Sequence, residues 1–462
     1  MLLYISAILP ARSETFVYRE VFALRARGLP VHTASVHAPE PNLGEPRLDD
    51  LASTAIPIYA SGPFRLLLDA TLETLTHPLR TLSTKFRALA DILTCDDVPW
   101  PRRPRLLYQA LAALALARRL RGCRALQPDR ITHIHAHMAH VPTTIAMYTA
   151  HQLRIPFSFT GHANDLFPNR SLLRQKIRRA AFVSCISRWH QSFYHDLTAT
   201  PLANLPIIRC GVDVPQVAQV SDLCPAAQPS SEQPAAQQPI HLLAVGRLIK
   251  KKGFDVLLDS LSRLHTSHPD LAARLHLSIA GDGPELTPLT AQAAALRSKH
   301  NLSCSTIRLL GPLPNPAVRA LMQTADLFVL PCRIDPSGDR DGIPVVLMEA
   351  MAAAVPVISG RLPAIEELVE HDHTGLMVPP GDAQALANAL ARVLTDNTLR
   401  ARLAAAGRQR VVDEFSEPVN IDRLMSALGL QAADRASDRP TNRTDRASDR
   451  APSHPPAASE LA

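Results

Sequence analysis

The sequence predicts an α/β protein of two Rossmann-like domains whose parallel sheets face each other across a cleft. The length of 462 residues exceeds what one hydrophobic core usually supports. Both halves of the chain alternate short apolar strands with helices of about 10–15 residues, the pattern of parallel sheets covered on both faces. A segment at 215–239, rich in Pro, Gln, Ser and Ala, divides the chain into two parts of domain size.

The domain boundaries follow from this composition. We expect an N-terminal domain at 1–214, a disordered linker at 215–239 and a second domain at 240–415. A helix at 416–431 should return to the N-terminal domain. The tail at 432–462 repeats the polar motif DRASDR and should be disordered, because it has little to bury.

The elements of both domains can be assigned in order. In the first half, helices are expected at 14–28 and 172–181, and strands at 4–10, 31–36, 131–137, 157–162, 182–187 and 205–213. In the second half, strands are expected at 241–246, 275–281, 307–311, 326–332 and 355–360. Helical patterns separate or follow them, among them 345–354, 364–370 and 385–394. Pro344 lies near the first position of one helix, where proline favours a helix start.

Composition excludes several classes of protein. The chain is 46% hydrophobic and 20% charged, which is typical of globular proteins and not of disordered ones. No apolar run approaches the length of a membrane span, and the first residues lack a basic leader, so no signal peptide is expected. The seven cysteines are scattered and never spaced Cys-x-x-Cys, which favours a reducing cytosol over a disulfide framework or a zinc knuckle.

The positive charge is concentrated in the first half. Residues 1–214 hold 25 Lys and Arg against 15 Asp and Glu, while the whole chain carries a formal charge of +7. Either this half meets an anionic partner or the coding sequence is biased toward arginine. Nucleic acid is the less favoured anion, because aromatic residues make up only 4% of the chain and no stacking motif accompanies the basic residues.

A basic, glycine-bounded segment follows the first strand of the second half. It runs from Gly246 to Gly253 and contains Arg247 and Lys252. Glycine lets the backbone approach a ligand, and an arginine fork with a lysine point charge suits a diphosphate. A solvated basic loop is the alternative interpretation, and the position at a strand end favours phosphate.

A second polar loop, 335–343, precedes the helix at 345–354. Its Asp341 is either the N-cap of that helix or a ligand-binding carboxylate. Glu349 lies inside the helix among apolar neighbours, and a carboxylate in that setting usually faces a polar group.

The first half contributes histidines and one acidic loop. His133, His135 and His137 alternate along one strand and share a face, which resembles a metal cluster, yet no acidic ligand is apparent beside them. Ser13 and Glu14 lie at the start of the first helix, where a capping role and an acceptor-binding role are equally open. The stretch 102–124 has arginines at both ends of an Ala/Leu middle, and either docks as an ordinary helix or lies on an anionic membrane.

The order of these motifs resembles the retaining family 4 glycosyltransferases, which have the GT-B fold. The resemblance rests on the motifs at 246–255, 281–284, 342–352 and 375–382, and it covers about 1–430 apart from the linker. Further motifs at 10–17, 133–137 and 159–165 are similar to the branch that makes exopolysaccharide, capsule or colanic-acid-like glycans.

The resemblance implies roles at matching positions. Arg247 and Lys252 would hold the donor diphosphate, and Glu349 would bind the nucleotide ribose. Asp341 would lie by the sugar hydroxyls, with Gly246 and the amides of Gly342 and Ile343 near sugar and phosphate. His162 would face the reacting side of the sugar from the other domain, which would be the acceptor side. The further acceptor-side candidates are Ser13, Glu14, His137 and Asp165.

The implied activity is retaining transfer of a sugar from a nucleotide-diphosphate-sugar to a glycan or lipid-linked acceptor, without metal or cofactor. The implied location is the cytoplasm, at the inner face of a membrane. One position departs from the family: Asp341 stands where a glutamate is usual. A catalytically weakened nucleotide-sugar-binding protein is therefore the alternative, and a sugar-nucleotide epimerase fits the motifs less well.

Overall fold

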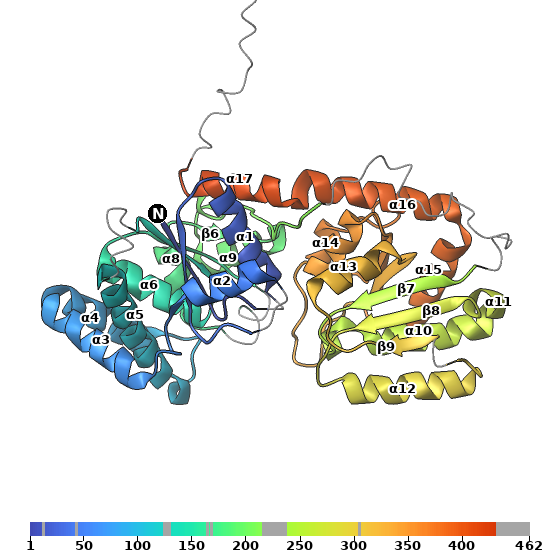
Figure 1. The fold of residues 1–462 in the computed structure, drawn as a ribbon, viewed down its shortest axis with the longest axis horizontal. Helices are drawn as coiled ribbons and strands as arrows, with labels where there is room; N and C mark the ends of the chain where they lie inside the picture. Colours follow the sequence, from blue (N-terminus) through green and yellow to red (C-terminus); the bar gives the residue numbers. More distant parts are fainter. Residues whose placement is uncertain are drawn as a thin grey trace, which may run out of the picture.

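Two α/β domains lie side by side in the computed structural model (Figure 1), which describes residues 1–11, 14–41, 45–122, 131–162, 166, 170–214, 238–303 and 306–430. Each domain holds one six-stranded sheet in which every pairing is parallel. The predicted fold class is confirmed. Most of the predicted linker and the entire tail 432–462 lie outside the described residues, and the domain boundaries stay a prediction.

The two sheets share one topology. The first has the order β3-β2-β1-β4-β5-β6 and the second β12-β11-β10-β7-β8-β9, so each reads 3-2-1-4-5-6 when its strands are counted from its own first. The strands are β1 (Leu2–Ser6), β2 (Val31–Ser35), β3 (Ile56–Pro57), β4 (His133–His137), β5 (Phe157–Thr160), β6 (Val183–Ser184), β7 (Ile240–Val245), β8 (Leu275–Ala280), β9 (Ile307–Leu309), β10 (Leu327–Leu330), β11 (Val357–Gly360) and β12 (Leu376–Val378).

The central strands are buried on both faces, as helices on each side of a parallel sheet require. Every residue of β1, β4 and β10 is buried. In the register of the first sheet, Leu3 lies opposite Ile134 and Tyr4 opposite His135. Polar histidine side chains are thus carried into the middle of this sheet.

Helices cover both sheets. The first domain has α1 (Thr15–Ala26), α2 (Pro46–Thr54), α3 (Pro63–Thr76), α4 (Pro78–Thr94), η1 (Trp100–Arg102), α5 (Pro104–Gly122), α6 (Val141–Leu153), α8 (Leu173–Arg179), α9 (Arg188–Thr198) and η3 (Leu202–Asn204). The remaining helices are η7 (Lys250–Lys252), α10 (Phe254–Ser267), α11 (Pro269–Ala272), α12 (Leu286–Lys299), α13 (Asn315–Gln323), α14 (Val345–Ala352), η8 (Ile365–Glu367), α15 (Ala383–Thr395), α16 (Asn397–Arg410), the π-helical turn η9 (Val411–Phe415) and α17 (Glu417–Ala427).

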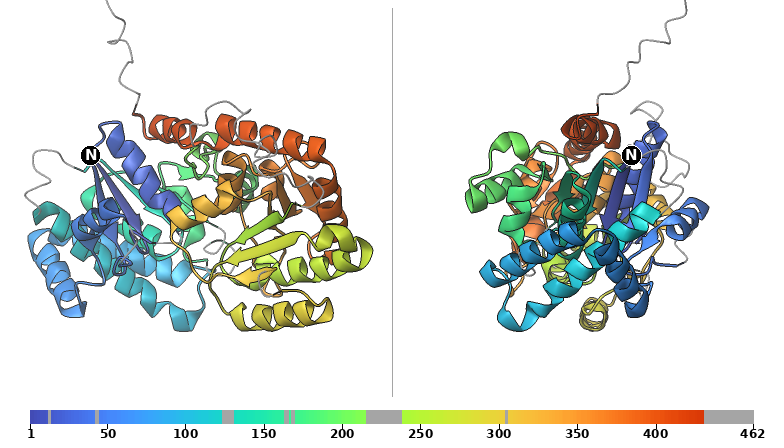
Figure 2. Two further views of the ribbon diagram at one scale, coloured as in Figure 1. Left: turned by 45° about the vertical axis from the view of Figure 1, so that its right-hand side comes forward. Right: turned by 90° about the vertical axis from the view of Figure 1, so that its left-hand side faces the viewer.

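The last helices run across the top of both domains (Figures 1 and 2). α16 lies over the second domain, and α17 continues over the first. Ile421, Leu424 and Met425 of α17 share a core with Val17 and Tyr18 of α1. The end of the described chain is therefore built into the N-terminal domain.

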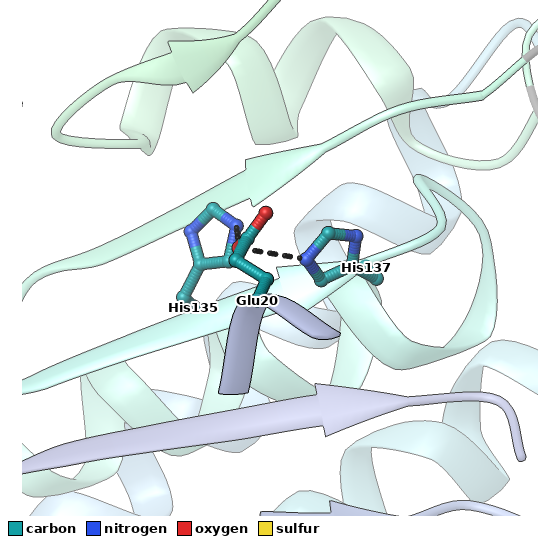
Figure 3. Close-up of side chains that lie close together, drawn as sticks. All are labelled: Glu20, His135 and His137. Atoms are coloured by element: carbon teal, nitrogen blue, oxygen red, sulfur yellow. Dashed lines mark hydrogen bonds and ion pairs between the residues drawn. The ribbon is translucent and has the colours of Figure 1, made fainter. Parts of the chain in front are cut away.

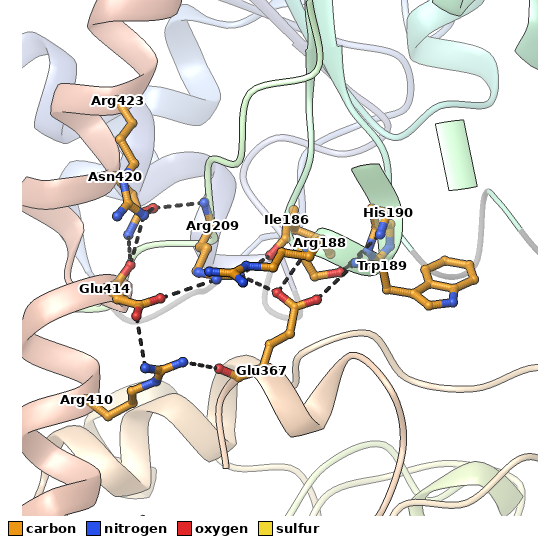
Figure 4. A network of polar contacts seen from close by, with 11 residues as sticks. Ile186, Arg188, Trp189, His190, Arg209, Glu367, Arg410, Glu414, Asn420 and Arg423 are labelled. Carbon is orange, nitrogen blue, oxygen red and sulfur yellow. Dashed lines mark hydrogen bonds and ion pairs between the residues drawn. The ribbon is translucent and has the colours of Figure 1, made fainter. Parts of the chain in front are cut away.

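A polar network ties the two domains together beneath these helices (Figure 4). Arg209 of the first domain is paired with Glu367 at 3.0 Å and with Glu414 at 3.3 Å. Glu367 also accepts the backbone N–H groups of Arg188 and Trp189 at the start of α9. A carboxylate of one domain thus caps a helix of the other, which fixes how the two halves meet.

Two local expectations are wrong, and two strands were not expected. The segment 205–213 forms only single bridges, Cys185 with Ile207 and Val212 with Ser416. The helix expected at 364–370 is the short turn η8. The strands β3 and β12 were not predicted. Helix α5 buries Leu106, Ala113 and Leu116 in the core, so the docked helix is the correct reading of 102–124. No described helix is both long and apolar enough to cross a membrane.

Candidate active site

The sequence motifs gather where the strand order of each sheet reverses. In a sheet of this order the reversal lies between the first and fourth strands, and ligands bind at the carboxyl ends there. These strands are β1 and β4 in one domain and β7 and β10 in the other. Gly246–Gly253 follows β7, the loop with Asp341 follows β10, Glu14 follows β1 and His140 follows β4.

The basic segment after β7 is held close to the sheet by glycine. Gly253 has a φ of +70°, and a Cβ built on it would overlap the carbonyl oxygen of Pro331. This close approach turns Lys252 toward the loop after β10, where its Nζ lies 2.9 Å from Oδ2 of Asp341. Gly246 packs against the Lys252 stem. Arg247 is exposed beside them.

Asp341 is a largely buried ion-pair partner, with 12% of its side chain exposed, and not a helix cap. α14 begins at Val345 with Pro344 as its N-cap residue, so the capping interpretation is wrong. Burial would raise the pKa of Asp341, but attraction to Lys252 and Lys251 outweighs burial and holds the pKa below its usual value. The thiol of Cys332 also donates to Asp341 at 3.2 Å.

Lys252 is the matching charge. Burial would lower the pKa of Lys252, yet the neighbouring Asp341 carboxylate raises it above the ordinary value. The lysine is therefore cationic at any pH near neutrality. A cation held ready at this strand end suits an anionic leaving group.

Glu349 reaches across to the other domain. Its Oε1 lies 2.7 Å from Nη2 of Arg19 on α1, and the Arg19 side chain is only 8% exposed. The polar partner expected for this carboxylate is thus a cation of the opposite domain. Gly342 and Ile343 follow Asp341 in the chain; Gly342 faces Ile186 and His190 across the domain boundary, and Ile343 is part of the core of the second domain.

On the side of the first domain, histidines and a carboxylate lie close together (Figure 3). Glu20 of α1 lies 3.2 Å from Nε2 of His137, whose Nδ1 lies 3.4 Å from Nε2 of His162. Burial, reinforced by repulsion from His137, holds the pKa of His162 well below its usual value, so this imidazole is neutral at pH 7. His162 also packs on Phe16, with ring centroids 4.5 Å apart.

Glu20, His135 and His137 place three ligand atoms within 4.8 Å of one another, an arrangement that could hold a metal ion. Each atom already has a hydrogen-bonding partner. The Tyr4 hydroxyl donates to Glu20 at 2.6 Å, and His135 bonds Ser158 and Thr160. The acidic neighbour that the sequence did not reveal is Glu20.

Glu14 is the N-cap residue of α1, but its side chain makes no capping bond. The Ser6 hydroxyl donates to its carboxylate at 3.3 Å, and burial raises the pKa of Glu14. The charge of Arg247, from the other domain, slightly lowers the pKa of the same carboxylate and so opposes the effect of burial. Ser13 and Asp165 lie outside the described residues.

Arg19 and Glu20 are the site residues that sequence reasoning missed. The rule applied to Glu349, that a charge inside an apolar helix faces a polar group, applies equally to the helix TFVYREVFALRA of α1. Arg19 and Glu20 are adjacent in that helix, and one meets Glu349 while the other meets His137. Cys332 carried no comparable signal.

Comparison with known proteins places the second half of the chain in a family. Residues 228–410 match the model of the glycosyl transferases group 1. The amylovoran biosynthesis glycosyltransferase AmsK of Erwinia amylovora is 34% identical over 194 residues, which are 42% of this chain and 46% of that protein. The putative colanic acid biosynthesis glycosyltransferase WcaL of Escherichia coli is 32% identical over 233 residues, 50% of this chain and 52% of that one. The chain thus spans about half the length of these relatives.

Solved structures share the fold. HepE of Anabaena, solved with UDP and glucose, has a TM-score of 0.60 at 15% identity over 93% of this chain and 99% of its own. Sucrose-phosphate synthase of Thermosynechococcus elongatus gives 0.60 at 19% identity over 93% and 98%. Both likenesses establish the GT-B fold.

Proposed function

We propose, from the match of residues 228–410 to the group 1 glycosyl transferases, that this chain moves a sugar from a nucleotide-diphosphate-sugar to a glycan or lipid-linked acceptor. The observation that carries the proposal is that charged groups of the second domain lie against the first domain at the strand ends. Lys252 pairs with Asp341 after β7 and β10, and Glu349 of α14 pairs with Arg19 of α1. On the first domain, His137 at the end of β4 lies beside His162, which follows β5.

The donor would occupy the second domain. Its diphosphate would meet Arg247, Lys252 and the backbone of Gly246, while Glu349 would take the ribose and Asp341 the sugar hydroxyls. Gly342 and Ile343 would lie along the phosphate and sugar. Because Lys252 and Glu349 each have an ion-pair partner, the donor would replace Asp341 on the lysine and Arg19 on the glutamate.

Catalysis would rest on electrostatic stabilisation of the leaving group. As the sugar bond breaks, negative charge grows on the β-phosphate, and preformed cations placed there lower the barrier. We propose retention of configuration by attack on the same face, with the departing phosphate taking the acceptor proton. Neutral His162 would line the reacting side of the sugar, and closure of the cleft would exclude water.

The acceptor would approach from the N-terminal domain, past Glu14 and His137, with Ser13 and Asp165 as further candidates. The similarity to AmsK and WcaL supports an acceptor in cell-surface polysaccharide synthesis at the cytoplasmic face of a membrane. No resident cofactor or metal is proposed, and the nucleotide sugar is a substrate.

The test is transfer by the purified full chain. A panel of nucleotide sugars is incubated with lipid-extract acceptors, and products are identified by mass spectrometry. Lys252→Ala should lower the yield of product about 100-fold or more, while Lys299→Ala, a change to an exposed lysine of the same domain, should leave it unchanged. Nucleotide binding without transfer or donor hydrolysis across the panel would instead establish the weakened binding protein suggested by Asp341.

A further inference from the structure

The hairpin of α3 and α4 directs an apolar face toward solvent and a polar face toward the domain. In this hairpin most large apolar side chains face solvent, although Leu66 and Ile92 are buried; Leu79 and Phe64 are 82% and 81% exposed. The exposed apolar residues of the two helices are Phe64, Leu67, Leu68, Leu75, Leu79, Leu82, Phe86, Leu89 and Leu93. The helical spacing of these residues places them along one face of each helix. Exposed apolar faces of this kind mark sites of interaction. The hairpin lies at the end of the N-terminal domain away from the second domain (Figure 1).

Polar contacts fix this orientation on the inner side. Asp69 and Glu73 of α3 are buried, paired with Arg119 at 2.7 Å and with Arg121 at 3.2 Å. On α4, Asp91 is buried and paired with Arg179 at 2.6 Å.

Two threonines complete the inner face. The Thr84 hydroxyl donates to Gln152 at 2.7 Å, and the Gln152 amide donates to Glu73 and to the Thr81 hydroxyl. Rotating either helix to bury its leucines would expose these partners or leave them unpaired. The outward apolar face is therefore a feature of the folded protein.

The outward charges are all positive. Arg65, Lys85 and Arg87 are exposed and Arg80 is half-buried, whereas the three acidic residues of α3 and α4 are all buried. The hairpin consequently presents leucine, phenylalanine and cationic groups together.

A basic cavity adjoins α4. It has a volume of about 530 Å³ and is lined by Arg80, Arg87, Arg154, Arg179 and His151, with Leu79 at its wall. Burial lowers the pKa of His151, and repulsion from Arg87, Arg179 and Arg154 lowers it further, which reports the positive field inside. Within the described residues, Arg80, Arg87 and Arg154 have no ion pair, so an anionic group could meet them there.

We propose that the α3–α4 hairpin docks this protein on an anionic lipid bilayer, with its leucines and phenylalanines in the interface and phosphate headgroups at the basic cavity. Amphipathic helices with aromatic and aliphatic residues beside cationic ones bind such surfaces. A second copy fits less well, because a two-fold contact would set Lys85 and Arg87 against their own counterparts. The inference does not depend on sugar transfer, since it is read out by lipid binding.

The test is flotation of the full chain with vesicles of phosphatidylcholine, with or without phosphatidylglycerol. The wild type should float with the anionic vesicles and release at high salt. Leu79→Glu/Phe86→Glu should lower the bound fraction at least tenfold. Lys85→Gln/Arg87→Gln should lower affinity about fivefold for each charge near the surface. Leu202→Glu, a change to an exposed leucine of the same domain outside the hairpin, is the matched control and should bind as the wild type does.

Other results would overturn the proposal. The proposal would be wrong if the wild type floated equally with both vesicles or with neither. This measurement uses the wild type alone, so it does not depend on whether the variants fold. A wild-type dimer that Leu79→Glu/Phe86→Glu converts to a monomer, without vesicle binding, would assign the face to a second copy. Inorganic phosphate that occupies the cavity without competing with vesicles would place the headgroup site elsewhere.

Discussion

The two domains share one sheet topology, but each forms its side of the proposed site, here called its wall, from a different kind of side chain. The second domain uses paired charges at its strand ends, with Lys252 against Asp341. The first domain uses buried imidazoles held by hydrogen bonds, with His135 on Ser158 and His137 on Glu20. The proposed donor wall, on the second domain, is therefore electrostatic, and the proposed acceptor wall, on the first, is largely neutral. The two should respond differently to acid, mutation and metal.

Acid should give the largest effect and should act on the first domain. Burial lowers the pKa of His133 to about 4 and that of His190 to about 3, against about 6.5 in an unfolded chain. Below pH 6.5 these histidines bind protons in the unfolded chain but stay neutral in the folded domain. The free energy of unfolding therefore falls as the pH falls toward 4. At pH 5 each such histidine should cost about 2 kcal/mol.

Hydrogen exchange at pH 7 and pH 5 measures this difference. Peptides of β4 and α9 should lose protection before those of β7 and α10. His133→Gln should flatten the pH dependence, and His268→Asn, a change to an exposed histidine of the second domain, should not. Simultaneous loss of protection in both domains would contradict the comparison.

Removing a donor-wall cation comes next. Arg247→Ala and Lys252→Ala should each lower kcat/KM about 100-fold or more, because losing a stabiliser of developing charge costs about 3–4 kcal/mol. Arg263→Ala, at an exposed position of α10, is the control for steady-state kinetics. Near-wild-type values in both variants would remove the phosphate assignment.

Site residues could be predicted from the sequence where they lie in loops directly after predicted strands. Gly246, Lys252, Asp341 and Glu349 follow two strands of one domain, and loop composition beside apolar strands is visible in the chain itself. The acceptor wall instead combines α1, β4 and β5, whose proximity depends on tertiary packing.

The α3–α4 hairpin was missed for a related reason. Apolar periodicity predicts a buried face, and in this hairpin the apolar face points outward while Asp69, Glu73 and Asp91 point inward. The partners of these inward carboxylates are contributed by α5, α6 and α8, which lie far along the chain, so the inward direction of the polar face could not be predicted from the hairpin sequence alone.

The two carboxylates of the donor wall should separate transfer from binding. Asp341→Asn should lower kcat roughly 10- to 100-fold, the worth of a charge-assisted hydrogen bond, and leave nucleotide affinity unchanged or higher because Lys252 is released. Glu349→Gln should mainly weaken nucleotide affinity, since a ribose contact is ground-state binding. Calorimetry beside steady-state kinetics compares them, with Asp341→Glu expected to be tolerated. Normal transfer by Asp341→Asn would limit that residue to a structural ion pair.

Loss of the ion pair between Arg19 and Glu349, which joins the two walls, should have a smaller effect. Arg19 holds Glu349 across the domain boundary, so Arg19→Gln should free the carboxylate and tighten nucleotide binding by about threefold to tenfold, a fraction of a charge-assisted bond. Arg27→Gln is the control, because it breaks a different ion pair, between the residue that follows α1 and Asp422. Weaker nucleotide binding by Arg19→Gln would mean that Arg19 itself contacts the donor.

Removal of divalent metal should have the smallest effect, because it should change nothing. The donor phosphates are expected to meet Arg247 and Lys252, so transfer in EDTA should equal transfer with added Mg²⁺ or Zn²⁺. Among the described residues, the group that could hold a metal ion is Glu20 with His135 and His137, which lies on the acceptor wall and not beside the proposed phosphate site. The position of any required metal can therefore be tested. Activity that EDTA abolishes and Zn²⁺ restores, with Glu20→Gln losing the restoration, would make that wall a metal centre and end its description as neutral. Activity that needs Mg²⁺ but ignores Glu20→Gln would instead place the ion on the diphosphate, and would show that two cations are too few for the leaving group.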